Sequence, residues 1–329
     1  MRPLVLPPNP VPRFYRGGAA IAALRGTTEV GERTPEEWVG STTTVFGERE
    51  LGLSPLADGR LLRDAVAADP AAFLGPDHAA ERGADPQLLV KLLDAGERLP
   101  VHVHPDAAFA RETLDSPYGK TEAWIVIDTA GPTATMHVGF LEDVSGQTLE
   151  HWVRDQDTAA LLAALNVVDV SRGDVLFVPA GTPHAIGEGV LLVELQEPSD
   201  LSILLEWQGF ASGETDASLG LGWDVALECV DRAATDADRL LADRLPAEAD
   251  SFFRAERIDG SHPAELDRGF AILVLTEGAG ELRLDDGEPL PVGRGDTLLV
   301  PWDAGPWRLE GDVVGVACRP PAAGAGGPA

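Results

Sequence analysis

The chain has 329 residues, of which 44% are hydrophobic and 24% charged, and its formal net charge is −29. This length allows two ordinary domains or one large β-rich unit, and the hydrophobic fraction is enough to bury a core. The negative charge argues against nucleic acid and anionic membrane surfaces as partners, because both would repel the protein.

Neither a membrane-spanning nor an export segment is expected. No apolar run reaches the roughly 18 residues of a transmembrane helix. Prolines interrupt the first ten residues, which therefore do not resemble a signal peptide. Cys229 and Cys318 lie far apart without metal-ligand spacing, so neither a disulfide nor a thiolate metal site is expected. We therefore expect a protein of the reducing cytoplasm.

The first third of the chain mixes irregular, helical and β-prone stretches. Residues 1–30 are rich in proline and glycine and predict an irregular entry segment. Residues 34–37 have the composition of a helix start or turn, and a β-prone run follows at 42–46. Helical patterning covers 61–74, and the apolar run 88–93 predicts a buried strand.

The rest of the chain is predicted to be mostly strands. A strand is expected at 120–127, then an amphipathic helix at 148–165. Strands at 167–170, 174–178 and 190–195 precede a second helical stretch at 223–248. Residues 252–318 alternate β-prone runs with turns, and the tail 320–329 is expected to be disordered.

An internal repeat divides this β-rich chain. Residues 172–184 (RGDVLFVPAGTPH) are echoed by residues 294–306 (RGDTLLVPWDAGP), but only the first copy ends on a histidine, His184. Two related β units are therefore expected, and only the first can bind metal. The predicted division is a metal-binding unit with helical segments at 1–220, a helical connection at 221–250, a second β unit without metal ligands at 251–319, and the tail at 320–329.

His102 and His104 are the strongest chemical signal in the sequence. On a strand-like stretch, side chains two apart project from the same face, so the two imidazoles provide half of a metal site. Short strands, glycine turns and the repeat, without a βαβ rhythm, favour jelly-roll barrels. The predicted fold class is mainly β, with two jelly-roll units and helical insertions.

Two stretches resemble the motifs of the cupin superfamily. Residues 96–104 have the spacing G-x5-H-x-H of the front half of cupin motif one, and residues 173–184 have the spacing G-x5-P-x-G-x2-H of motif two. The glutamate that completes motif one usually follows within a few residues. In this chain the best candidate, Glu122, follows only after a long loop.

A delayed glutamate is typical of the type I mannose-6-phosphate isomerases, and the chain is similar to a divergent member of that family. Similar segments occur in the family's order at residues 36–41, 88–106, 119–124, 179–186 and 194–200. The resemblance covers roughly residues 30–205. It implies a metal-dependent interconversion of mannose-6-phosphate and fructose-6-phosphate through a cis-enediol.

The resemblance also implies one divalent metal ion held by His102, His104, Glu122 and His184. The family normally has glutamine at the position of His102. Zinc suits three nitrogens and one carboxylate. Manganese, cobalt, iron or nickel would fit nearly as well.

Catalytic and substrate-facing residues follow from the same resemblance. Lys120, Glu194 and Asp200 are the implied catalytic groups, and Lys120 would lie beside the metal, where its pKa should fall and suit proton transfer. Lys91 either faces the substrate or neutralises a buried carboxylate. The substrate-binding candidates are Glu36, Trp38, Ser41 and Lys91.

One position departs from the family. The family has an active-site arginine where this chain has Leu204, which removes a bidentate partner for anionic oxygens. The candidate replacements are Arg16, Arg111 and Arg172. A free sugar or another phosphosugar therefore stays open as the substrate, as do a cupin dioxygenase and a non-catalytic sugar-binding protein. The expected partner is a small sugar or sugar phosphate, and the oligomeric state is open, with a monomer favoured.

Overall fold

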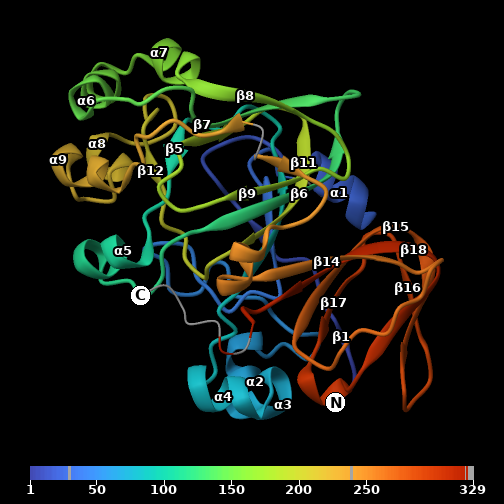
Figure 1. Ribbon diagram of the computed structural model, residues 1–329. Helices are drawn as coiled ribbons and strands as arrows, with labels where there is room; N and C mark the ends of the chain where they lie inside the picture. Colours follow the sequence, from blue (N-terminus) through green and yellow to red (C-terminus); the bar gives the residue numbers. More distant parts are fainter. Residues whose placement is uncertain (29–30, 238–239, 323, 325–329) are drawn as a thin grey trace.

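The computed structural model describes residues 1–28, 31–237, 240–322 and 324. It consists of antiparallel sheets in two units that lie side by side, with short helices around them (Figure 1). This confirms the mainly β class that the sequence predicts. None of the described helices combines the length and apolar character that crossing a bilayer requires.

A seven-stranded sheet forms the centre of the molecule. Successive residues of β4 are all buried and alternate between two cores: Val90 and Leu92 pack on one face, and Leu93 packs on the other. A strand covered on both faces has a continuous apolar run, as the sequence shows here. The strand order is β13 (Leu241–Ala242), β9 (Val175–Val178), β6 (Glu122–Thr129), β11 (Val190–Gln196), β4 (Leu89–Asp94), β3 (Glu36–Val39) and β2 (Pro10–Val11).

A five-stranded sheet completes the first unit and brings its histidines together. Its strand order is β12 (Ile203–Leu204), β5 (His102–Val103), β10 (His184–Ile186), β7 (Ala134–Phe140) and β8 (Leu165–Val170). In this register His102 lies opposite both His184 and Leu204. Residues far apart in the sequence therefore meet on one sheet.

Short helices cover the outer face of the five-stranded sheet. Leu149, Val153, Leu161 and Trp223 belong to one apolar cluster with Val103 of β5. The helices of this side are α5 (Ala107–Leu114), α6 (Gly146–Asp155), α7 (Thr158–Ala163), α8 (Glu214–Ala217), α9 (Trp223–Ala226) and the 3-10 turn η1 (Leu227–Cys229).

The second unit is a six-stranded sheet with two long strands. The order is β1 (Leu4–Val5), β17 (Thr297–Val300), β15 (Ala271–Leu284), β18 (Trp307–Arg319) and β14 (Arg254–Asp259), with β16 (Leu290–Gly293) on β15. β15 and β18 enclose their own core around Leu273, Leu309 and Trp307.

The two units share one further core. Ile272 and Val316 of the second unit pack in the same cluster as Val90 and Ile125 of the first. The N-terminal strand β1 also pairs with β17, so residues 4–5 lie in the sheet of the second unit. The predicted division at residues 220 and 251 stays a prediction, and the chain crosses between the units near its start.

Helices α2 to α4 lie below this shared core in Figure 1. Their predicted stretch, 61–74, forms two helices, because Pro70 opens a new helix that Asp69 caps through its side chain. The remaining helical elements are α1 (Ala19–Arg25), α2 (Leu62–Ala68), α3 (Pro70–Leu74), α4 (Pro76–Arg82), η3 (Ala247–Ser251) and η4 (Trp302–Ala304).

Two other stretches differ from the sequence prediction. Residues 36–39 form β3, whereas 42–46 form no strand, because only the earlier segment reaches β4 to pair with it. The stretch 223–248 contains α9, η1 and β13 rather than a continuous helix. Single residues anchor it to different cores, Val230 to one and Leu240 to another. In the tail predicted to be disordered, 323 and 325–329 lie outside the described residues.

Candidate active site

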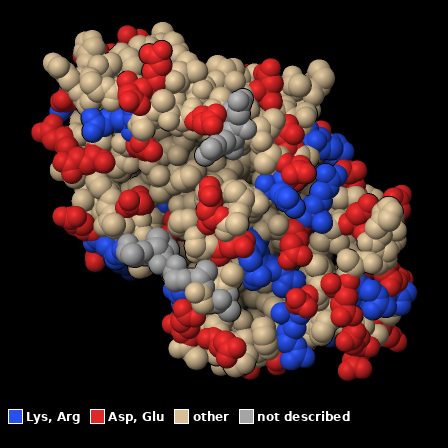
Figure 2. Space-filling view, viewed as in Figure 1, with Lys and Arg blue, Asp and Glu red and all other residues tan. Residues whose placement is uncertain are grey.

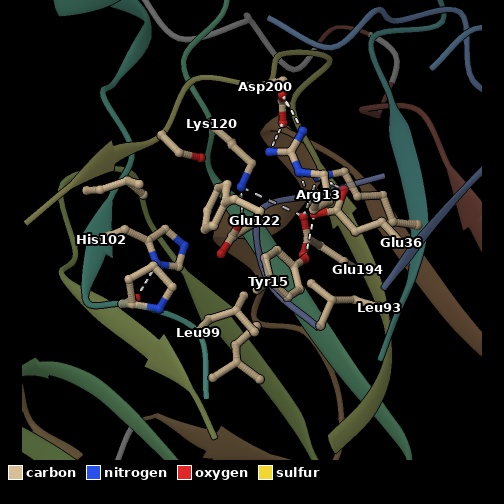
Figure 3. A pocket seen from close by; sticks show the side chains of 16 residues that line it. Arg13, Tyr15, Glu36, Leu93, Leu99, His102, Lys120, Glu122, Glu194 and Asp200 are labelled. Atoms are coloured by element: carbon tan, nitrogen blue, oxygen red, sulfur yellow. Dashed lines mark hydrogen bonds and ion pairs between the residues drawn. The ribbon is translucent and has the colours of Figure 1, made fainter. Parts of the chain in front are cut away.

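A cavity in the first unit contains most of the predicted site residues. Seven acidic and basic side chains other than histidine line it, together with apolar groups such as Leu93 and Leu99 (Figure 3). The seven are Arg13, Glu36, Lys91, Lys120, Glu122, Glu194 and Asp200. So many charges in one buried cavity favour a functional site over an ordinary core.

Three buried histidines meet beside this cavity, and one of them, His102, lines it. One ring nitrogen of each of His102, His104 and His184 lies within 4.8 Å of the other two. Each Nδ1 lies against a backbone carbonyl oxygen, that of Pro100 at 2.8 Å, Leu201 at 2.7 Å and Thr182 at 2.8 Å. Because a carbonyl only accepts, each Nδ1 carries a proton, and Nε2 is the nitrogen of each ring that could bind a metal. Metal-binding histidines are held in this way.

Glu122 adds a carboxylate to the histidine cluster. Its Oε1 lies 3.2 Å from Nε2 of His184, and its Oε2 lies 3.3 Å from Nε2 of His104. Burial opposes its ionisation, but Lys120 and His104 outweigh that effect and hold the pKa of Glu122 well below its usual range. Glu122 is therefore the anionic member of the cluster.

His102 and His104 are neutral at pH 7. Burial lowers the pKa of His104 to about 3, with Lys120 as the next cause. Burial and then the neighbouring His184 lower the pKa of His102 well below its usual value. Three imidazole nitrogens and one carboxylate suit a divalent cation such as zinc. The buried Nε2 of His184 has no hydrogen-bond partner among the described residues, as expected of an atom that serves as a ligand.

Lys120 places a cation against this donor set. Its Nζ lies 2.7 Å from Nε2 of His104 and 2.7 Å from Oε2 of Glu122. It lies just before β6, not on it, and its side chain still reaches the cluster as the sequence predicts. The cluster of histidines and Glu122 thus already accommodates one cationic group, the Lys120 ammonium. The same Nζ is 3.8 Å from Oε1 of Glu194, so Lys120 also faces the rest of the cavity.

Lys91 resolves an open choice of the sequence interpretation. Its Nζ lies 3.2 Å from Oε1 of Glu194 and 3.6 Å from Oε2 of Glu36, so it neutralises two buried carboxylates while it lines the cavity. Burial raises the pKa of Glu194. At Glu36, burial is outweighed by Arg13 and Lys91, and the pKa falls to about 2.

Arg13 is the cavity residue that the sequence interpretation missed. Its Nη1 and Nη2 donate to the two carboxylate oxygens of Asp200 at 2.9 and 3.2 Å, and its Nε lies 3.3 Å from Oε1 of Glu36. The hydroxyl of Tyr15 donates to the same Glu36 oxygen at 2.6 Å. The signal in the sequence that could have indicated Arg13 is its position beside aromatic residues in the entry segment.

The three arginines named from the sequence do not line this cavity. Arg16 pairs with Glu97 near the surface, Arg172 pairs with exposed acids, and Arg111 is exposed on α5. Leu204, at the position where the family has arginine, does face the cavity, on the strand beside His102.

Two predicted substrate-binding residues lie outside the lining of this cavity. Neither Trp38 nor Ser41 is among the described residues that line the cavity. Trp38 is fully buried, and its Nε1 donates to Oε2 of Glu36 at 2.7 Å, so it holds that carboxylate in place. The hydroxyl of Ser41 donates to the carbonyl of Thr43 in a turn.

Comparison with known proteins gives one consistent set of relatives. No family model matches the chain. "Mannose-6-phosphate isomerase" of Streptococcus mutans is 28% identical over 232 residues, which cover 69% of this chain and 72% of the relative. "Probable mannose-6-phosphate isomerase GmuF" of Bacillus subtilis is 32% identical over 198 residues, 60% of this chain and 59% of the relative.

Solved structures of similar name share the fold. The mannose 6-phosphate isomerase from Bacillus subtilis matches with a TM-score of 0.77 at 24% identity, over 97% of this chain and 100% of its own. A mannose 6-phosphate isomerase bound with zinc and yttrium matches with a TM-score of 0.73 at 17% identity, over 98% and 100%. At these identities the likeness concerns the fold.

Proposed function

We propose that the chain is a mannose-6-phosphate isomerase, which interconverts mannose-6-phosphate and fructose-6-phosphate with one bound divalent metal ion. Its relatives of that name, at 28% and 32% identity, support this proposal. The observation that carries this proposal is the cluster of His102, His104 and His184 with an ionised Glu122, beside a cavity that Lys120 and Glu194 also line. These residues can hold a metal and move protons within the same small volume.

His102, His104, Glu122 and His184 would hold the metal, as in other cupin-type sites. Zinc is the first candidate, and manganese, cobalt, iron and nickel suit the same donors. A bound divalent ion would supply Lewis acidity toward the carbonyl and hydroxyl oxygens of the sugar.

Lys120 and Glu194 are the proposed proton-transfer groups. The isomerisation moves one proton from C2 to C1 and another from O2 to O1. Glu194, whose pKa burial raises, is suited to take the C2 proton and return it to C1 of the cis-enediol. The Lys120 ammonium is close enough to Glu194 to donate to the enediol oxygens at the same time.

Arg13, which pairs with Asp200 in this structure, is proposed to bind the anionic end of the substrate. Arg13 is the one guanidinium among the described lining residues, and both of its terminal nitrogens face the cavity region of Asp200. Turning from Asp200 to a phosphate would give it a bidentate partner of the same geometry. We propose that it supplies the group that Leu204 lacks, with Glu36 and Lys91 fixing its position.

An unphosphorylated sugar is the second candidate substrate. Each cation of the cavity already faces a carboxylate: Arg13 faces Asp200, Lys91 faces Glu194, and Lys120 faces Glu122. With Leu204 beside them, this pairing favours a neutral ligand over a phosphate dianion.

Deuterium exchange separates these candidates. The metal-loaded protein is incubated in D2O with mannose-6-phosphate, fructose-6-phosphate, mannose or fructose, and deuteration of the sugar is followed by NMR. We expect exchange with the phosphorylated pair. Exchange with the free sugars alone would contradict the phosphate assignment. If none of the four sugars exchanged deuterium in the presence of zinc, manganese or cobalt, the isomerase proposal would be contradicted. His104→Ala, which should lose the metal, is the matched inactive control.

We also propose a monomer in the cytoplasm. Cys229 and Cys318 are both free, which suits a reducing compartment. Gel filtration with light scattering at micromolar concentration tests the oligomeric state.

A further inference from the structure

A groove lies where helices α3 and α4 approach the second unit. Its volume is about 300 Å³, and four arginines line it: Arg82, Arg254, Arg268 and Arg319. Figure 2 shows basic side chains gathered along the hollow between the α2–α4 helices and the second unit, on a face where acidic side chains are scattered elsewhere. The groove shares no lining residue with the metal cavity.

We propose that this groove binds a small organic phosphate, at a second site that is separate from the metal cavity. The proposal does not rest on the isomerase activity. The volume of the groove falls within the range of small-ligand pockets, at the lower end.

The charge of the groove is unusual for this chain. The protein has a formal charge of −29, yet the groove lining has four guanidiniums and three carboxylates, those of Asp77, Glu81 and Asp267. Among the described residues, neither Arg254 nor Arg268 forms an ion pair with a carboxylate. Arg254 donates through Nε to the carbonyl of Pro320 at 3.1 Å, and Arg268 lies over the Trp302 ring at 5.9 Å. Their charge is therefore available to an anion.

Arg319 gives an independent indication. Only 4% of this residue is exposed, so its guanidinium is buried at the base of the groove. Its Nη2 donates to the carbonyl of Asp267 at 3.1 Å, while Nε makes no hydrogen bond and has only the exposed Glu256, 3.3 Å away. Burial and, to a lesser extent, the nearby Arg254 lower the pKa of Arg319. A bound anion would offset both the burial of the Arg319 charge and its repulsion by Arg254.

The shape and chemistry of the lining favour an organic phosphate. Guanidiniums bind phosphate oxygens bidentately. Trp302 forms an apolar wall of the groove. The α3–α4 junction packs closely against its ring, which only a glycine allows, because a Cβ on Gly75 would lie 2.7 Å from the ring. A phosphate can thus meet the arginines while its organic part lies against Trp302.

Titration calorimetry on the full-length protein tests the site. The probes are inorganic phosphate, mannose-6-phosphate and mannose, and the background carries His104→Ala so that binding in the metal cavity is weakened. The test variant is Arg254→Gln with Arg268→Gln, because truncation of the buried Arg319 could prevent folding. Arg257→Gln is the matched control, since Arg257 is an exposed arginine of the same strand β14 that does not line the groove.

We expect mannose-6-phosphate to bind with one saturable site that the double variant weakens at least tenfold and Arg257→Gln leaves unchanged. Mannose should not bind at this site. Equal affinity in the double variant, or equal weakening by Arg257→Gln, would overturn the proposal. The result does not depend on whether the protein is an isomerase, because the experiment measures binding without turnover. With His104 intact, the double variant should also keep full isomerase activity.

Discussion

The two copies of the internal repeat begin with the same turn. Gly173 and Gly295 both have positive φ, 98° and 89°. In each copy the next aspartate accepts a hydrogen bond from the backbone N–H three residues earlier, at 2.7 Å for Asp174 and 2.8 Å for Asp296. A buried strand follows in both, β9 in the first unit and β17 in the second. The shared residues are therefore those that build the turn and strand.

The copies diverge after the proline that ends the strand. In the first unit the chain continues into β10 and places His184 opposite His102. In the second unit it forms η4, and Trp302 packs against Gly75. One β framework thus presents the histidine that we propose as a metal ligand in one unit, and the Trp302 indole in the other. A few side chains beyond the strand decide the chemistry.

The largest effect is expected from removing the ligand that distinguishes the copies. His184→Ala should abolish stoichiometric metal binding and lower kcat/KM by about a thousandfold or more, because Lewis-acid stabilisation is worth several kcal/mol. Metal content by mass spectrometry and the isomerase assay check this. His137→Ala, on the neighbouring strand β7, is the control and should keep the metal. Full metal content in His184→Ala would contradict the ligand assignment.

Alanine at the two turn glycines measures how differently the copies are packed. Both positions have positive φ, which costs an L-residue about 1–2 kcal/mol. A Cβ at Gly295 would also collide with the backbone carbonyl of Leu24, whereas at Gly173 it would meet only the end of the Arg257 side chain, at 3.2 Å. We expect Gly295→Ala to lower the free energy of unfolding by about 3 kcal/mol and Gly173→Ala by about 1 kcal/mol. Urea unfolding checks the difference, and equal losses would contradict it.

The sequence predicted those parts of the molecule that have local signals. The apolar run at 88–93 became β4, because a strand buried on both faces needs no polar alternation. The spacing of His102 and His104 put both rings in the cavity cluster. His184 was found because the turn before it is recognisable in the repeat.

Long-range pairing was not visible in the sequence. Arg13 reaches the cavity only because the entry segment crosses between the units, where β1 pairs with β17 and β2 pairs with β3. No local pattern links Arg13 to Asp200, 187 residues later. The surroundings of Trp38 and Ser41 were also not visible in the sequence: Trp38 packs with Val11 and Leu89, and Ser41 lies in a turn beyond β3.

Substitution of Arg13 tests whether the entry segment, which crosses between the units, contributes to the active site of the first unit. Arg13→Ala should reduce kcat/KM for mannose-6-phosphate about 10- to 100-fold, because a hydrogen bond to a charged group is worth about 1.5–3 kcal/mol. Free mannose should lose less, since it has no phosphate. Arg16→Ala, three residues along and paired at the surface, is the control. A larger loss for free mannose would place Arg13 at the wrong end of the substrate.

The smallest effect concerns acid sensitivity, which should arise in the first unit. In the metal-free protein, His104 stays neutral until about pH 3, while in the unfolded chain it takes up a proton near its usual pKa of 6.5. The unfolded state therefore binds more protons between about pH 6.5 and 3, and stability falls as the pH is lowered through that window. His102 shifts in the same direction. From pH 6.5 to 5.5 the two should remove about 1–2 kcal/mol. Urea unfolding of the chelated protein should show this slope and lose part of it in His104→Asn. His262→Asn, exposed in the second unit, should leave the slope unchanged, and the reverse result would place the acid-sensitive group in the wrong unit.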